Sequence, residues 1–137
     1  MAFVKVRGRT KIEWLPITPS TALVAGTLLE WTSGLLAAAD DNDTDVAGVL
    51  LKTIATTDGD YASTRLVGVI VPVEKHVEWE ADTADTFVQA THGGVECGIV
   101  DSANIDLDDT TNDVFRPLKP GRAALKVIGH LKINGSY

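Results

Sequence analysis

The stretch Arg65-Leu66-Val67-Gly68-Val69-Ile70-Val71-Pro72-Val73 is the most apolar run in the sequence and decides the predicted fold. Many of its residues are β-branched, and such side chains fit the pleated surface of a sheet. A short run of this composition predicts a buried strand, and Pro72, which lacks an amide donor, should end it. We therefore expect a central strand of a β-rich domain here.

Strand signals continue on the N-terminal side of this run. A hairpin is predicted from Gly26–Thr32 and Leu35–Ala39, because Ser33-Gly34 between them is a suitable two-residue turn. The acidic segment Asp40–Asp45 should form a polar loop, after which Val46–Thr53 returns as a strand. These segments extend the β pattern over the first half of the body.

The C-terminal half adds further strands and one helical segment. Thr83–Thr91 is the one helix candidate, with Asp82 or Thr83 as N-cap and Gly93 as the stop. Further strands are predicted at Glu74–Glu80, Val95–Val100 and Ala124–Ile133. Short strands separated by polar turns favour a mostly β fold, a small β-barrel or β-sandwich of about eight strands with one short helix.

The first residues have a pattern of their own. Phe3–Ile12 alternates apolar and basic residues, which is typical of a half-buried strand or of an extended arm. Gly8 suggests a bend, and Pro16 and Pro19 should interrupt strand pairing. We therefore predict an extended basic N-terminal arm over residues 1–16, separable from a single β-rich domain over residues 17–137.

Charge is divided into three blocks along the chain. The net charge is -7, yet residues 1–12 and 114–137 carry basic residues and no acid, while all 19 acidic residues lie between them. An acidic surface disfavours direct binding to nucleic acid, which depends on neutralising phosphates. The segregated charge fits contacts with other proteins, or neutralisation of the middle by the two ends within one molecule. Both interpretations stay open at this point.

Composition excludes several classes of protein. A chain of 137 residues is long enough for one domain with its own core. The single cysteine, Cys97, excludes an internal disulfide framework and a thiolate-rich zinc site. No apolar run approaches the roughly 20 residues that a membrane helix needs. No membrane partner is therefore expected.

No catalytic or metal-binding motif is present in the sequence. The spacing of His76, His92 and His130 matches no metal site, and Cys97 alternates with Val95 and Ile99 as a core residue would. Asp41, Asp43 and Asp45 suggest calcium, but an EF-hand loop would need Gly at position 46 and Glu at position 52. Those positions are Val46 and Lys52, so a solvated turn is favoured. We expect no enzyme activity, no cofactor and no metal.

Three tryptophans offer a different kind of site. Trp31 and Trp79 lie on predicted strands between polar residues, which favours packing in the core or at a subunit interface over stacking on a ligand. Trp14 lies in the predicted arm, and an apolar residue on an arm without a core should be buried against a partner.

The order of elements from Thr27 to Asp82 resembles a structural family. Ser33–Ala38, an acidic turn, Val46–Leu50, a second polar turn and a long apolar strand that leads into Val77-Glu78-Trp79 resemble the lambda-like head decoration proteins of tailed phages. The wider group of phage capsid cement proteins looks similar around Pro19-Ser20-Thr21, Ala25–Leu28 and Asp60-Tyr61-Ala62.

This resemblance implies a structural virion protein. Such proteins are small β-rich domains that bind the outer surface of an expanded icosahedral capsid as homotrimers and stabilise contacts between major capsid proteins. Their N-terminal arm commonly pairs with a capsid element, although those arms are often rich in Thr and Pro and nearly uncharged. Carried over to this chain, the arm assigns capsid binding to Phe3, Val4, Lys5, Val6, Arg7, Arg9, Lys11 and Trp14.

Trp31 and Trp79 are the candidates for the trimer interface. The alternative function is a carbohydrate- or receptor-binding β-module that uses exposed tryptophans, and an enzyme with a carboxylate site in the acidic loops ranks third.

Overall fold

A computed structural model describes residues 2–137 of the chain. Within these residues, eleven strands and one short helix confirm the mostly β prediction. Five strands form a closed barrel in the order β2 (Thr10–Ile17), β4 (Leu35–Ala38), β3 (Leu28–Thr32), β5 (Gly48–Leu50) and β6 (Arg65–Pro72).

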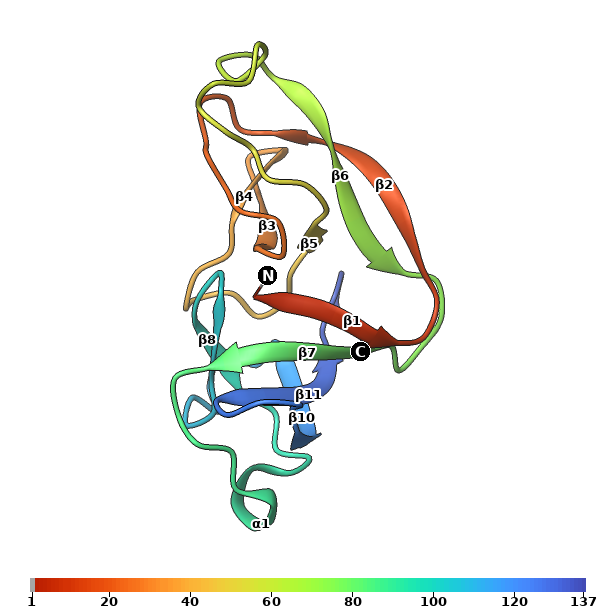
Figure 1. Cartoon of the computed structure of the whole chain (residues 1–137), viewed down its shortest axis with the longest axis vertical. Coiled ribbons are helices and arrows are strands. Elements are labelled where there is room, and N and C mark those ends of the chain that lie inside the picture. The colour runs from red at the N-terminus through yellow and green to blue at the C-terminus, as the bar shows by residue number, and fades with distance from the viewer. Residues whose placement is uncertain (1) are drawn as a thin grey trace.

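The remaining strands form a six-stranded sheet below the barrel in the view of Figure 1. The order of five of them is β10 (Phe115–Pro120), β11 (Lys126–Leu131), β7 (Glu78–Thr83), β9 (Asn104–Asp106) and β8 (Gly98–Asp101), and β1 (Phe3–Arg7) pairs with β7.

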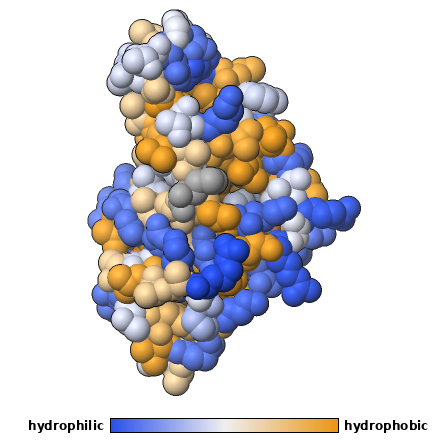
Figure 2. All heavy atoms as spheres, viewed as in Figure 1, coloured by the Kyte–Doolittle hydropathy of each residue, from blue (hydrophilic) through white to orange (hydrophobic). Residues whose placement is uncertain are grey.

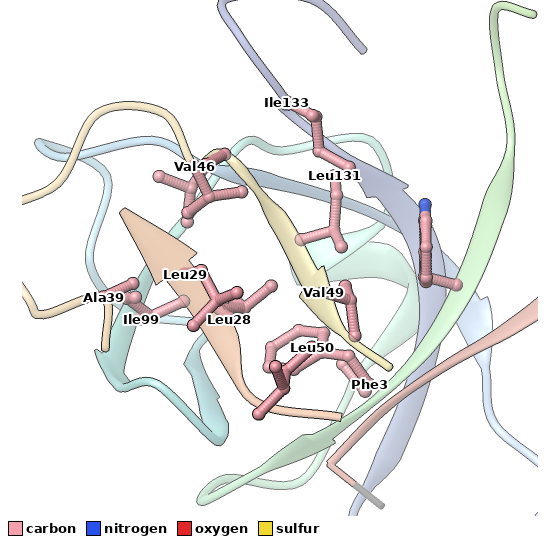
Figure 3. Close-up of a cluster of buried hydrophobic side chains, with 14 of the residues drawn as sticks. Phe3, Leu28, Leu29, Ala39, Val46, Val49, Leu50, Ile99, Leu131 and Ile133 are labelled. Atoms are coloured by element: carbon pink, nitrogen blue, oxygen red, sulfur yellow. The ribbon is translucent and has the colours of Figure 1, made fainter. Parts of the chain in front are cut away.

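The barrel and the sheet share one hydrophobic core. Phe3 of β1 and Leu131 of β11 are buried together with Leu28 of β3 and Val49 of β5. Figure 3 shows these side chains converging from strands of both layers. Burying apolar area on this scale is the main favourable contribution to folding.

The predicted hairpin and the predicted central strand are both confirmed. β3 and β4 pair from Leu29↔Ala38 to Thr32↔Leu35, and the turn residues Ser33 and Gly34 have φ angles of 52° and 83°. Two positive φ values match the twist that a two-residue hairpin requires. β6 lies between β2 and β5, and the valines at positions 67, 69 and 71 are buried.

The prediction of a separable arm over residues 1–16 is wrong for the residues that the structure describes. β1 pairs with β7 from Phe3↔Ala81 to Arg7↔Glu78, and the side chain of Phe3 is fully buried. β2 then pairs with β6 along its whole length. The alternating pattern was that of half-buried strands, because the domain itself supplies their partners.

Two features at the ends of β2 explain where that prediction failed. Gly8 does bend the chain, with φ of 97° and its α-hydrogen side against Val77, so that β2 leaves the sheet and joins the barrel. Pro16 does not interrupt β2. It pairs with Leu66 at a position whose amide faces away from β6, and an edge strand tolerates proline there.

The predicted helix is mostly replaced by strand and loop. β7 continues to Thr83, whose buried hydroxyl accepts from the Asp85 amide and donates to the Ile105 carbonyl, so this residue anchors a strand end and caps no helix. The helix α1 is Gln89–His92 alone, and it ends at Gly93 as predicted. No helix within the described residues is long and apolar enough to span a membrane.

Candidate functional site

The antiparallel pair β2–β6 presents an apolar surface on the outside of the barrel. Its register runs from Thr10↔Pro72 to Ile17↔Arg65. Side chains alternate between the two faces of a strand pair. Since the odd-numbered valines of β6 point into the core, the even-numbered residues of β6 and their partners on β2 lie on the opposite face. We call this opposite face the outer face, and it consists of Ile12, Trp14, Pro16, Leu66 and Ile70.

The large apolar side chains of the outer face are unusually exposed. Trp14 is 62% exposed, Leu66 59% and Ile12 47%. In Figure 2 hydrophobic residues gather over the part of the molecule where Figure 1 places β2 and β6. A contiguous exposed apolar patch on a small protein marks an interaction site more often than single exposed apolar residues do.

Gly68 shapes the centre of the outer face. It lies opposite Trp14, and a Cβ atom at its position would stand 3.0 Å from Leu51 Cδ2 and 3.3 Å from Ile12 Cγ2. The missing side chain therefore lets Leu51 and Ile12 close over the backbone of β6. The result is an apolar surface from which the Trp14 ring stands free.

A shallow hollow of about 330 Å³ borders Trp14 at one end of the outer face. Arg65 lines it and is held by Asp58, at 3.0 Å, and by Asp60. The amide of Ala55 and the Arg65 guanidinium both donate to Asp58, and they lower the pKa of its carboxyl group. An aromatic ring thus stands beside a fixed arrangement of charged groups.

The residues predicted for capsid binding do not form one surface. Phe3 is buried in the core, so it is unavailable to a partner in this fold. Val4 and Val6 are half-buried, while Lys5, Arg7 and Arg9 are exposed on or beside β1. Lys11 and Trp14 lie on β2 but on opposite faces of it, and only Trp14 belongs to the outer face.

Basic residues from both ends of the chain form ion pairs with carboxylates of the acidic middle. Arg9 donates from its amide and its Nε to the Glu74 carboxylate, at 2.8 and 3.1 Å, and lowers its pKa. At the other end, Arg122 binds the buried Glu80 and lowers its pKa in the same way. Of the two interpretations of the charge blocks, these ion pairs support neutralisation within one molecule.

The two other tryptophans lie in different environments. Trp79 is only 1% exposed and is part of the core, so it is a wrong candidate for the trimer interface: the N-terminal strand β1 pairs with β7 and helps to enclose it. Trp31 is 47% exposed near the tip of the β3–β4 hairpin and stays available for a subunit contact.

Two groups of three carboxylates come together, and neither is the set Asp41, Asp43 and Asp45 for which the sequence favoured a solvated turn. Asp43 lies beside Glu30 and Asp40, while Asp85, Asp106 and Asp108 form the second group. The hydrogen bond to Asp43, with burial and the charge of Asp43, raises the pKa of Glu30 to about 7.

The buried cysteine and the histidines offer no assembled nucleophilic site. Cys97 points into the core, as predicted, and burial raises the pKa of its thiol to about 12. A thiol in that state is a poor nucleophile. His92 accepts a hydrogen bond at Nδ1 from the Val88 amide at the small helix. His76 and His130, which are far apart in sequence, have ring centroids 5.2 Å apart.

Sequence reasoning missed most of the outer face. The apolar composition of β6 on both of its faces predicts a buried position for Leu66 and Ile70 as well. Only the lack of a covering layer in the described part of the chain leaves one face exposed. The signal that could have helped is Gly68, which interrupts the run of large apolar residues on that face.

No family model matches the chain, no curated protein matches it, and no solved structure matches it.

Proposed function

We propose that the protein is a structural subunit of a virion, which binds the outer surface of an expanded icosahedral capsid as a homotrimer and stabilises contacts between major capsid proteins. The observation that carries the proposal is the outer face: an exposed tryptophan in a continuous apolar surface on two strands that pair over eight residue pairs. The resemblance of the Thr27–Asp82 segment to phage head decoration proteins supplies the class of partner.

The outer face replaces the arm as the proposed contact. Tryptophan is enriched among the residues that dominate binding energy, and apolar neighbours that exclude water strengthen it. A surface on paired strands needs little ordering on binding, whereas a free arm of ten residues would lose on the order of 10 kcal/mol in backbone entropy. The proposed role requires no catalytic group, cofactor or metal.

Trp31 is the residue proposed for the trimer contact. It lies on β3, which β4 separates from β2 in the barrel. A contact at Trp31 therefore leaves the outer face free for the capsid. Binding through several identical sites on one particle gains affinity from the high effective concentration of the second and third sites.

The experiment is sedimentation of purified protein with decoration-free, expanded phage heads from its source. Stoichiometric co-sedimentation is expected for the wild type, and a Trp14→Ala/Leu66→Ala double variant should lose most of it. The matched control is Val24→Ala/Val100→Ala, which removes two exposed apolar side chains outside the outer face. Wild-type protein that stays in the supernatant, or equal loss in both variants, would refute the proposal.

A second candidate function is a carbohydrate-binding module. The hollow beside Trp14 favours it, because sugars stack on exposed aromatic rings and bond to fixed charged groups such as Asp60 and Arg65. A screen against immobilised glycans tests it. Binding that depends on Asp60 as well as on Trp14 would favour a sugar site, since the capsid contact relies on the apolar residues.

A further inference from the structure

Strand β2 has one side without a partner strand. It pairs with β6 over eight residue pairs, but it meets β4 only at Ile17↔Leu36. Figure 1 shows most of β2 at the rim of the barrel, with β6 on one side of it. The closure of the barrel therefore covers one end of β2 and leaves Thr10–Pro16 as an open edge.

The register determines which backbone groups lie on that edge. The amide of Val73 donates to the Arg9 carbonyl at 3.1 Å, so the odd-numbered residues of β2 direct their backbone groups toward β6. In an antiparallel pair, the residues between the hydrogen-bonded ones direct their backbone amides and carbonyls away from the partner strand. The amides and carbonyls of Thr10, Ile12 and Trp14 thus face the open side, and within residues 2–137 no strand pairs with them.

We propose that this edge pairs with the same edge of a second copy of the chain, antiparallel and with Ile12 opposite Ile12 of the second copy. A two-fold axis would then pass beside Ile12, and Thr10 would exchange backbone hydrogen bonds with Trp14 of the second copy. Such a contact is isologous, since each molecule presents the same surface to the other. An exposed strand edge is a ready template for this kind of pairing.

Charge complementarity selects this register. With Ile12 on the axis, Lys11 lies opposite Glu13 of the second copy, and the reverse pair forms on the other side of the axis. Two neighbouring registers would also bring the backbone groups of the even-numbered residues together. In these registers the two-fold axis would pass beside residue 11 or beside residue 13. They would place Lys11 against Lys11 or Glu13 against Glu13, and like charges directly opposite are destabilising.

The two charged side chains are accessible for this role. The side chains of Lys11 and Glu13 are 54% and 39% exposed, and within one chain they form an ion pair of 3.0 Å. Pairing of two copies would bring Lys11 and Glu13 of both chains together on one face, where each charge lies next to charges of opposite sign. On the opposite face it would join two outer faces into one larger apolar surface.

This inference goes beyond the proposed function. Its occupant is a second copy of the chain, and self-association in solution tests it without any capsid. In a decoration lattice the contact would link neighbouring trimers across two-fold positions.

The test uses two single charge reversals, Lys11→Glu and Glu13→Lys. Either variant alone places like charges opposite each other, so its dimerisation constant should weaken about tenfold or more relative to wild type. An equimolar mixture of the two should recover dimers, because both acidic positions of one variant then face both basic positions of the other. The mixture also separates this effect from the ion pair within one chain, which neither variant retains.

Sedimentation equilibrium of each variant and of the mixture provides the measurement, with a fluorescent label on the Lys11→Glu chain. Labelled Lys11→Glu protein mixed with unlabelled Lys11→Glu protein is the matched control. Monomeric wild type up to about 1 mM, an oligomer insensitive to either reversal, or a mixture without recovery overturns the proposal. Failure of capsid binding with recovery in the mixture would reject the proposed function alone.

A backbone variant tests the strand pairing directly. Ile12→Pro removes an amide from the open edge and none from the β2–β6 ladder, so it should weaken the dimer while the monomer stays folded by circular dichroism. Ile12→Ala keeps the amide and controls for the side chain. Equal dimerisation of the wild type and a folded Ile12→Pro variant would contradict pairing through this edge.

Discussion

Trp14 on β2 lies directly opposite Gly68 on β6, at the centre of the exposed outer face. The glycine leaves room above the backbone of β6, and Leu51 and Ile12 occupy that room. One residue without a side chain therefore shapes a surface that is both apolar and open. The relationship connects the packing of the barrel wall to the surface that we propose for binding.

A Gly68→Ala variant should be destabilised by about 1 kcal/mol, since small-to-large changes in a packed site cost about 1–3 kcal/mol and the contacting side chains can partly move. The new Cβ would press on Leu51 and Ile12, at 3.0 and 3.3 Å. Urea unfolding measures the change. The matched control is Gly59→Ala, where no atom lies within 4 Å of the added methyl group. Equal stability of the two variants would contradict the packing described here.

Phe3→Ala should lower the free energy of unfolding by about 3–5 kcal/mol, as large-to-small changes at buried aromatic residues do. The side chain is fully buried in the core that the barrel and the sheet share. Lys5→Ala, on the same strand but exposed, should change stability by less than about 0.5 kcal/mol. Chemical denaturation of both variants tests whether the first strand belongs to the fold. A wild-type midpoint for Phe3→Ala would restore the separable arm.

Removing the Arg122 side chain should expose the cost of a buried carboxylate. Glu80 is 6% exposed, and the Arg122 Nε and Nη2 groups donate to it at 3.1 and 3.0 Å. We expect Arg122→Ala to lower the free energy of unfolding at pH 7 by more than the loss of a fully exposed pair and by less than the loss of a fully buried one, because the Arg122 side chain is 67% exposed and its amide still donates to Glu80.

The pH dependence and a surface control make this prediction specific. The pKa of Glu80 is lowered in the fold, so the stabilising pair is present above pH 4.5 and is lost as pH falls through the lowered pKa. The difference between wild type and Arg122→Ala should therefore shrink in acid. Arg7→Ala, which removes an exposed pair at 3.8 Å from Glu78, should cost less than about 1 kcal/mol. A constant difference at all pH values would argue against the pair.

Glu30 should make the protein less stable as pH rises from about 5 to about 8. Its pKa is raised to about 7 in the fold, because it shares a hydrogen bond with Asp43 and is partly buried. For an acid with a raised pKa, the stabilising contribution is complete below its ordinary value of 4.5 and disappears as pH passes about 7.

The variant Glu30→Gln keeps a neutral side chain at every pH, and its thermal midpoint relative to wild type isolates this contribution. We expect the thermal midpoints of the two proteins to differ little at pH 5. As pH rises toward 8, the variant should become steadily more stable than the wild type, because only the wild type loses stability when Glu30 ionises. Thermal melts at several pH values provide the measurement. A difference that does not change between pH 5 and pH 8 would show that Glu30 ionises normally.

Local features were predicted well because their causes lie within a few residues. The Ser33-Gly34 turn, the bend at Gly8 and the strand that ends at Pro72 each follow from backbone preferences of the residues themselves. The helix at Thr83–Thr91 failed for the opposite reason. Thr83 became the buried end of β7 through contacts with residues from β9 onward, which no local pattern could indicate.

The sequence by itself determined the β class, the strong turns and the core position of Cys97, since period and composition act through the chain's own backbone. Only the tertiary structure decided that Phe3 and Trp79 are buried together while Trp14 is exposed. All three aromatic residues lie on strands, and their neighbours in the sequence do not indicate burial: Trp79 lies between two glutamates and is buried, while Trp14, next to Leu15, is exposed. Burial depends on which strand covers a face, and that depends on pairings between distant segments such as β1 with β7 and β2 with β6.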